Sequence, residues 1–244
     1  MSLKPIFKRN WSFTTAVFLV ILLNIVILLT SELQFSRLAR LVSVAAFFMF
    51  YIFTGKLKSI WVYIALAFFL GQEIFFQFYE NSWGYKGYMI LGSLAYTVII
   101  VECLPKFNFK AINLGLIIVA ILLLLANTYT LNLLIEMLSL EFRDDFEIFL
   151  FYIYGAFMMI LGLIAVLYNN KYNSTRSLRY TFLAFCFVFS DIAALFAYYF
   201  GFDFFYIFSR LFFLIGIGLF VSYGLNYEIA REEIYEYEMI NKKS

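Results

Sequence analysis

The stretch Phe187-Val-Phe-Ser-Asp-Ile-Ala-Ala-Leu-Phe-Ala-Tyr-Tyr-Phe200 places one carboxylate, Asp191, in the middle of an apolar run. The run extends over residues 178–200, which is long enough for an α-helix to cross a lipid bilayer. A charged side chain at that depth is costly unless it faces the interior of a helical bundle. Asp191 is therefore a candidate functional residue inside a membrane protein.

The composition of the whole chain agrees with this interpretation. Of its 244 residues, 64% are hydrophobic and only 14% are charged, which lies outside the range of soluble domains. Phe and Tyr are abundant, whereas only two prolines occur, so uninterrupted helices are favoured over a β-barrel. We expect an all-α fold, a polytopic membrane helical bundle.

The absence of histidine from the sequence argues against several kinds of chemistry. It removes histidine-ligated metals and the Ser/His and Cys/His catalytic pairs. The two cysteines, Cys103 and Cys186, do not have the spacing of a metal site or of a disulfide framework. We therefore expect no metal and no cofactor. The net charge of +2 reflects basic residues in the connections, which is not the signature of a nucleic-acid surface.

Eight apolar runs predict eight transmembrane helices. The runs cover residues 11–30, 38–54, 60–79, 86–101, 112–134, 148–167, 178–200 and 204–223. Together they predict a single transmembrane domain over residues 1–226. Residues 227–244 form a charged tail, which we expect to continue the last helix into the cytoplasm.

The basic residues in the connections and at the ends of the apolar runs are distributed unevenly between the two sides. One side holds Lys4, Lys8, Arg9, Lys56, Lys58, Lys106, Lys110, Lys171, Arg176, Arg179, Arg231, Lys242 and Lys243, and the other holds Arg37, Arg40, Lys86 and Arg143. Positive residues are retained on the cytoplasmic side of a membrane. We therefore expect a multi-pass protein of the cell membrane with both termini in the cytoplasm.

The polar residues inside the runs are predicted to lie at a common depth. At a rise of 1.5 Å per residue, Asn24, Glu73 and Asp191 lie roughly 20 Å from the cytoplasmic ends of their helices. Ser93 and Arg210 lie roughly 10 Å from the outer ends, which is the same layer of a hydrocarbon core about 30 Å thick. The sequence thus predicts one polar layer in the outer half of the bundle.

Two carboxylates and one guanidinium in this layer suggest acid chemistry. Arg210 is the only basic residue in the interior of a predicted run, since Arg40, Lys86 and Arg179 lie within three residues of a run's end. It always carries its charge, so we expect Asp191 or Glu73 to neutralise it. The remaining carboxylate would then be a potential proton donor. An ion pair that only holds helices together is the alternative interpretation. Gln72 and Gln77, beside Glu73, are candidates for substrate-binding hydrogen bonds.

Three stretches resemble the YhhN family of eight-span lysoplasmalogenases. Phe187-Val-Phe-Ser-Asp-Ile-Ala-Ala-Leu is similar to its late Phe-Leu-x-Ser-Asp-x-x-Leu-Ala motif. Gly87-Tyr-Met-Ile-Leu-Gly-Ser-Leu-Ala-Tyr96 is similar to its Gly-x-x-x-x-Gly-His-x-x-Tyr motif, and Phe69-Leu-Gly-Gln-Glu-Ile-Phe75 to its Gly-Asp motif. The resemblance carries over to Asp191, Gly87, Gly92 and Tyr96. It implies hydrolysis of the vinyl ether bond of a lysoplasmalogen, which releases a fatty aldehyde.

The chain also departs from the family pattern. Gln72 occupies the place of the family's first aspartate, and Ser93 replaces its histidine. Glutamine cannot exchange a proton, so we expect weak or absent lysoplasmalogenase activity, with Glu73 as the nearest substitute for the missing acid.

The candidate site therefore comprises Asp191 and Glu73 as catalytic groups and Arg210, Gln72, Gln77, Ser93, Tyr96 and Asn24 as groups that bind a membrane lipid, for example a lysophospholipid. The alternative functions are a transporter or channel lined by Glu73, Asp191 and Arg210, and a purely structural membrane protein. Transport is less favoured because the sequence has no inverted repeat and no helix pair broken by Gly or Pro. The oligomeric state does not follow from the sequence.

Overall fold

The computed structural model describes residues 11–54, 59–104, 114–138 and 142–225, and every regular element in these ranges is a helix. The helices are α1 (Trp11–Thr30), α2 (Leu33–Thr54), α3 (Ile60–Phe76), α4 (Ser82–Cys103), α5 (Leu114–Met137), α6 (Asp145–Tyr172), α7 (Thr175–Tyr199) and α8 (Phe204–Leu225). The predicted all-α fold is confirmed for these residues. The predicted cytoplasmic tail, residues 227–244, lies outside them.

Six of the helices, namely α1, α2, α4, α6, α7 and α8, are long and apolar enough to cross a membrane. Helix α3 is also apolar but has 17 residues. Large hydrophobic side chains such as Phe18, Leu22 and Phe182 are exposed on the surface of the bundle, as expected where helices face lipid. The chain is therefore a helical, multi-pass membrane protein.

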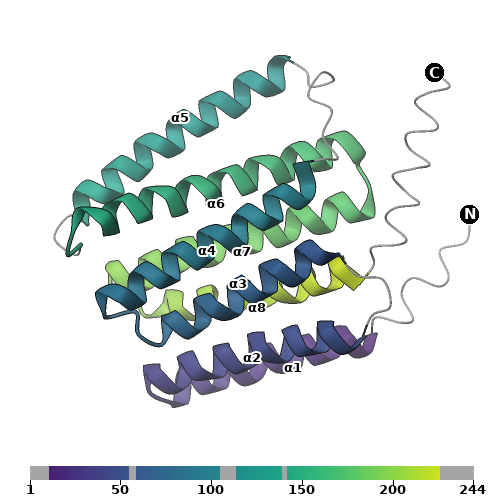
Figure 1. Ribbon diagram of the computed structural model, residues 1–244, viewed down its shortest axis with the longest axis vertical. Coiled ribbons are helices and arrows are strands. Elements are labelled where there is room, and N and C mark those ends of the chain that lie inside the picture. The colour runs from purple at the N-terminus through teal and green to yellow at the C-terminus, as the bar shows by residue number, and fades with distance from the viewer. Residues whose placement is uncertain (1–10, 55–58, 105–113, 139–141, 226–244) are drawn as a thin grey trace, which may run out of the picture.

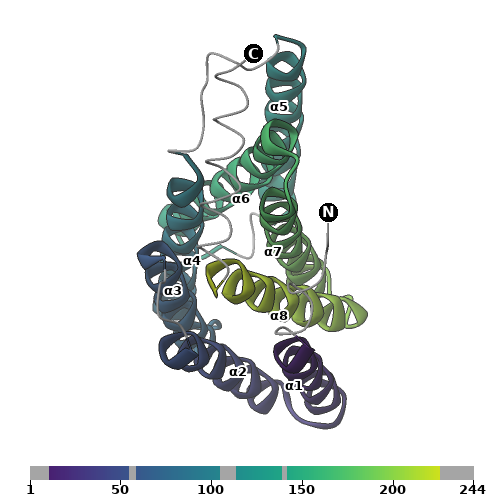
Figure 2. The ribbon, with the colours of Figure 1, turned by 90° about the vertical axis from the view of Figure 1, so that its right-hand side faces the viewer.

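The helices lie side by side with their axes roughly along one direction (Figure 1). Helices α3 and α4 pack together, as do α7 and α8, and α4 also packs against α6. Helix α8 lies in the middle of the bundle and contacts α1, α2, α3 and α7. Helix α5 packs mainly against α6, so it lies at one edge of the bundle while α1 and α2 form the opposite edge (Figure 2).

Polar contacts join four helix connections at one end of the bundle. The Arg37 guanidinium donates two hydrogen bonds to the Glu80 carboxylate, at 2.8 and 2.5 Å, and these hold the pKa of Glu80 below its usual value. Lys86 binds Asp144, whose side chain also caps the first turn of α6 by accepting from the backbone N–H of Glu147. The Tyr79 hydroxyl lies 3.2 Å from the hydroxyl of Tyr199, the last residue of α7. The α1–α2, α3–α4, α5–α6 and α7–α8 connections therefore share one end of the bundle.

Helix α2 begins at Leu33, five residues before the predicted start at residue 38. Arg37 and Arg40 therefore lie inside this helix and are buried, with 2% and 5% of their surfaces exposed. The prediction that both belong to a connection is wrong. The helix can bury them because each pairs with a carboxylate, Arg40 with Glu73 of α3 and Arg37 with Glu80 of the α3–α4 connection.

A second buried ion pair lies toward the opposite end of the bundle. Arg176 Nη2 lies 3.1 Å from Glu102 Oε1 and 3.0 Å from the Tyr223 hydroxyl, which donates in turn to Glu102 Oε2 at 2.7 Å. The sequence analysis placed Arg176 in a connection, but in the structure it belongs to the first turn of α7. This cluster connects α4, α7 and α8, and it lies outside the predicted site.

Candidate functional site

A cavity of about 310 Å³ lies between helices α2 to α7. Its wall is mostly aromatic and aliphatic, with Phe76, Met89, Leu131, Phe151 and Leu195 among the lining residues. The only charged side chains in the wall are Asp191 and Arg40. An apolar cavity with a few polar groups is the usual form of a site for a small organic ligand.

Asp191 faces this cavity from α7 and is held by two tyrosines. Its Oδ2 accepts a hydrogen bond from the Tyr154 hydroxyl of α6 at 2.9 Å and another from the Tyr96 hydroxyl of α4. Oδ1 accepts no hydrogen bond from the described part of the chain. The tyrosines therefore fix the orientation of the carboxyl group and leave one oxygen available to a ligand.

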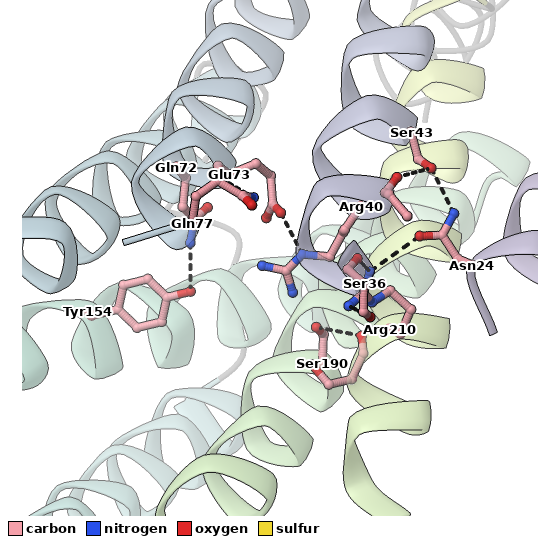
Figure 3. Close-up of polar contacts among 12 residues, drawn as sticks. Asn24, Ser36, Arg40, Ser43, Gln72, Glu73, Gln77, Tyr154, Ser190 and Arg210 are labelled. Atoms are coloured by element: carbon pink, nitrogen blue, oxygen red, sulfur yellow. Dashed lines mark hydrogen bonds and ion pairs between the residues drawn. The ribbon is translucent and has the colours of Figure 1, made fainter. Parts of the chain in front are cut away.

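Gln72 joins the same cluster from α3. Its Nε2 lies 3.5 Å from the Tyr154 hydroxyl oxygen, a long hydrogen bond that is drawn in Figure 3. Gly92 makes room for the contact, because a Cβ atom at that position would lie 2.5 Å from the Tyr154 ring and 2.6 Å from Gln72 Nε2. Of the predicted site residues, Gln72 and Tyr96 thus meet near Asp191. Gly92, one of the residues of the family resemblance, leaves the space for the contact between Gln72 and Tyr154.

Glu73 has a different partner from the one expected. Its Oε2 accepts a hydrogen bond of 2.5 Å from Arg40 Nε, and both side chains are buried (Figure 3). Glu73 is fully buried and is not among the residues that line the cavity, whereas Arg40 is. Asp191 and Glu73 therefore do not face the cavity together as a catalytic pair.

Arg210 forms no ion pair with a carboxylate in the described structure, so the expected direct pairing with Asp191 or Glu73 is wrong. Its Nη1 donates to the Ser36 carbonyl at 2.5 Å and to Asn24 Oδ1 at 3.3 Å, and its Nη2 donates to the Ser36 hydroxyl at 2.7 Å (Figure 3). Asn24 Nδ2 also donates to Ser43 Oγ at 2.7 Å. Arg210 and Asn24 thus connect α8, α1 and α2, and neither lines the cavity.

The two remaining predicted residues also lie outside the cavity wall. Gln77 caps the C-terminal end of α3, where its side chain donates to the Glu73 carbonyl at 3.1 Å. Ser93 is buried in α4, and its hydroxyl has no hydrogen-bond partner among the described residues. Nothing in their positions connects either side chain to a ligand in the cavity.

Arg40 and Tyr154 are the important residues that the sequence reasoning missed. Ser36, Arg40, Ser43 and Phe47 recur at intervals of three and four residues, which places them on one face of a helix that starts near Leu33. This pattern would have identified Arg40 as an inward-facing residue. Tyr154 had no comparable signal, because it is one of 19 tyrosines in the chain.

The comparisons with known proteins do not extend these observations. No protein-family model, curated protein or solved structure matches the chain. Within the described residues, no group of acidic or cysteine side chains is arranged to hold a metal ion.

Proposed function

We propose that the protein is a membrane lipid hydrolase of the lysoplasmalogenase type, in which Asp191 alone supplies the acid and the base. The observation that carries the proposal is the placement of Asp191 in the cavity wall, with Oδ2 held by Tyr96 and Tyr154 and with no described residue bound to Oδ1. The resemblance of the segment around Asp191 to the YhhN family supports the vinyl ether as the bond that is hydrolysed. The substrate is a lipid with one vinyl ether chain.

One carboxyl group is sufficient for this reaction because it gives up a proton and then recovers one. The protonated Asp191 transfers its proton to the β-carbon of the vinyl ether, which forms an oxocarbenium ion. The resulting carboxylate stabilises this cation and accepts a proton from the water that attacks the α-carbon. The hemiacetal then separates into a fatty aldehyde and the glycerophospho-alcohol, and Asp191 is again protonated.

The other predicted catalytic residue, Glu73, takes a supporting role in this proposal. It fixes Arg40 from behind the cavity wall and does not contact the substrate. A site with one carboxyl group lacks a separate base to activate water, so we expect slow turnover. This agrees with the weak activity expected from Gln72.

The test is aldehyde release from a vinyl ether lysophospholipid by the purified full chain in detergent. We expect slow release by the wild type and a loss of at least 100-fold in Asp191→Asn, which keeps the shape of the side chain but cannot transfer the proton. Asp144→Asn, which changes a carboxylate at the end of α6, is the matched control and should leave the rate unchanged. Wild-type protein that releases no aldehyde, or an Asp191→Asn variant that remains active, would contradict the proposal.

The same proposal includes the arrangement of the chain in the cell membrane. All eight helices cross the bilayer, and both termini are cytoplasmic. The uneven distribution of lysine and arginine supports this orientation. Burial of Arg37 and Arg40 within α2 strengthens the bias, because it removes two positive charges from the connections of the outer side.

A further inference from the structure

The Arg40 guanidinium is fixed in place but has most of its hydrogen-bonding capacity unused. Its Nε donates to Glu73 Oε2 at 2.5 Å, and its central carbon lies 3.9 Å from the centre of the Phe76 ring and 4.8 Å from that of Phe213. Neither Nη1 nor Nη2 has a hydrogen-bond partner among the described residues. Nη2 is buried with both of its N–H donors unsatisfied, and only 6% of the whole side chain is exposed.

Unsatisfied buried donors on a charged group require an explanation, because each costs free energy when it is removed from water. Arg40 lines the cavity, so a ligand there can accept these hydrogen bonds. The two Nη groups form one edge of a planar guanidinium, and this edge matches two oxygens of a phosphate or a carboxylate. The unused donors thus indicate an anionic group.

The balance of charge around Arg40 favours the same kind of group. Arg37 is paired with Glu80 and Arg40 with Glu73, but Arg210 binds only Ser36 and Asn24 in the described structure. Ser36 lies one helical turn from Arg40, so the Arg210 guanidinium, which forms no ion pair with a carboxylate among the described residues, is close to the Arg40 end of the cavity. Asp191, the other ionisable group of the cavity wall, is protonated in the proposed reaction and then adds no negative charge. The three guanidiniums therefore face two carboxylates, and this excess of positive charge attracts an anion.

The shape of the cavity indicates that this anion carries an apolar chain. The cavity extends from Arg40 in α2 to Thr130, Leu131 and Leu134 in α5, and these helices lie on opposite sides of the bundle (Figure 2). Between them the wall is formed mainly by aromatic and aliphatic side chains of α4, α6 and α7. Thr130 and Ile192 are exposed, so the cavity reaches the lipid-facing surface near α5.

We propose that Arg40 binds the anionic headgroup of a single-chain amphiphile and that the chain runs from there toward α5. The inference rests on the proposed function in using the same cavity and a protonated Asp191, and it assigns the orientation of the ligand. The shared chemistry of the ligand is a phosphate or carboxylate on one hydrocarbon chain. A lysophospholipid and a free fatty acid are the two sources of such a group.

The test compares probes that differ only in the headgroup. The purified full chain is analysed by native mass spectrometry with hexadecyl phosphate, palmitate and the uncharged monopalmitoylglycerol. We expect at least one anionic probe to bind tenfold or more tightly than the uncharged one. Preference for the phosphate identifies a phospholipid source, and preference for the carboxylate identifies a fatty acid source. Equal binding of all three probes would overturn the assignment, as would equally tight binding of inorganic phosphate without a chain.

The variants localise the headgroup. Arg40→Gln should remove the preference for anionic probes and leave binding of monopalmitoylglycerol unchanged. Because the single change leaves Glu73 buried without its partner, the double variant Arg40→Gln/Glu73→Gln provides the same test with both charges removed. Arg176→Gln, which breaks the other buried ion pair, is the matched control and should keep the preference. A double variant that still prefers anions would overturn the proposal.

The outcome can be separated from that of the proposed hydrolysis. Asp191→Asn should abolish aldehyde release but retain the headgroup preference, because Asp191 does not bind the anion. If the wild type shows the Arg40-dependent preference without hydrolysis, the headgroup site stands and the proposed reaction fails. If the wild type hydrolyses the vinyl ether without that preference, the proposed reaction stands and the headgroup site fails.

Discussion

At the scale of single residues, the Tyr154 hydroxyl connects the groups of the candidate site. It donates to Asp191, its oxygen lies within reach of Gln72, and its ring packs against those of Tyr88 and Tyr96 with centroids 6.2 and 5.4 Å away. The hydroxyl can therefore hold Asp191 only while the ring keeps its position. The ring can keep that position because Gly92 has no Cβ atom. Adding a single methyl group at Gly92 should therefore displace Tyr154.

Gly92→Ala should both destabilise the protein and displace Tyr154. The added Cβ would lie 2.5 Å from the Tyr154 ring, and overpacking of this kind costs about 1–3 kcal/mol. Thermal unfolding in detergent and aldehyde release measure the two effects. Gly162→Ala is the control, because its Cβ would meet only Val188, at 3.9 Å, and alanine favours a helix. Unchanged stability and activity in Gly92→Ala would show that Tyr154 does not depend on this space.

The sequence identified Asp191, Gln72 and Tyr96 of this site but not how they are connected. An isolated carboxylate in an apolar run is conspicuous because the membrane makes it costly. Tyr154 is inconspicuous, since a tyrosine in an apolar helix has many possible positions, including the lipid interface. Its role depends on the packing of α4 against α6, which no local pattern encodes.

At the scale of elements, the pairing of α2 with α3 explains why the predicted partners were wrong. Arg40 meets Glu73 because α2 begins early enough to bring Arg40 into the bundle. The apolar-run criterion began the helix at residue 38, which left Arg37 outside it and Arg40 at its edge. Arg40 was therefore counted with the connection, and Arg210 was treated as the only basic residue within a span. An arginine that is stabilised by an ion pair is read as a loop residue when hydropathy alone sets the helix end.

The Arg40–Glu73 pair should therefore behave as a unit. Arg40→Met alone leaves Glu73 buried without a counter-ion, which should cost about 3–5 kcal/mol of stability. The double variant Arg40→Met/Glu73→Leu removes both charges and should recover most of the loss. Thermal unfolding of the single and double variants forms a double-mutant cycle. Lys86→Met, at the exposed pair with Asp144, is a control that should change stability little. Additive losses in the cycle would mean that the two side chains do not interact.

At the scale of the whole molecule, the sequence predicted the order and number of the helices correctly for the described residues. The repeated alternation of apolar runs and short polar connections fixes this arrangement, because consecutive antiparallel helices are the only simple way to bury such runs. It does not fix how the helices pack, and so the cavity beside α5 and the contact of α8 with α1 and α2 could not be predicted. The side of the membrane on which each connection lies follows only from the distribution of positive charge.

The last prediction tests that orientation. In a protein whose native thiols are removed by Cys103→Ala and Cys186→Ala, single cysteines are introduced by Glu32→Cys, Asp145→Cys and Thr175→Cys, all at exposed positions. We expect a membrane-impermeant maleimide to label positions 32 and 145 in intact cells, because the Arg37–Glu80 and Lys86–Asp144 contacts place their connections at one end. Position 175, at the opposite end, should react only after the membrane is opened. Labelling of 175 alone in intact cells would reverse the orientation, whereas labelling of 32 and 145 from opposite sides would mean that the bundle does not cross the membrane in the proposed way.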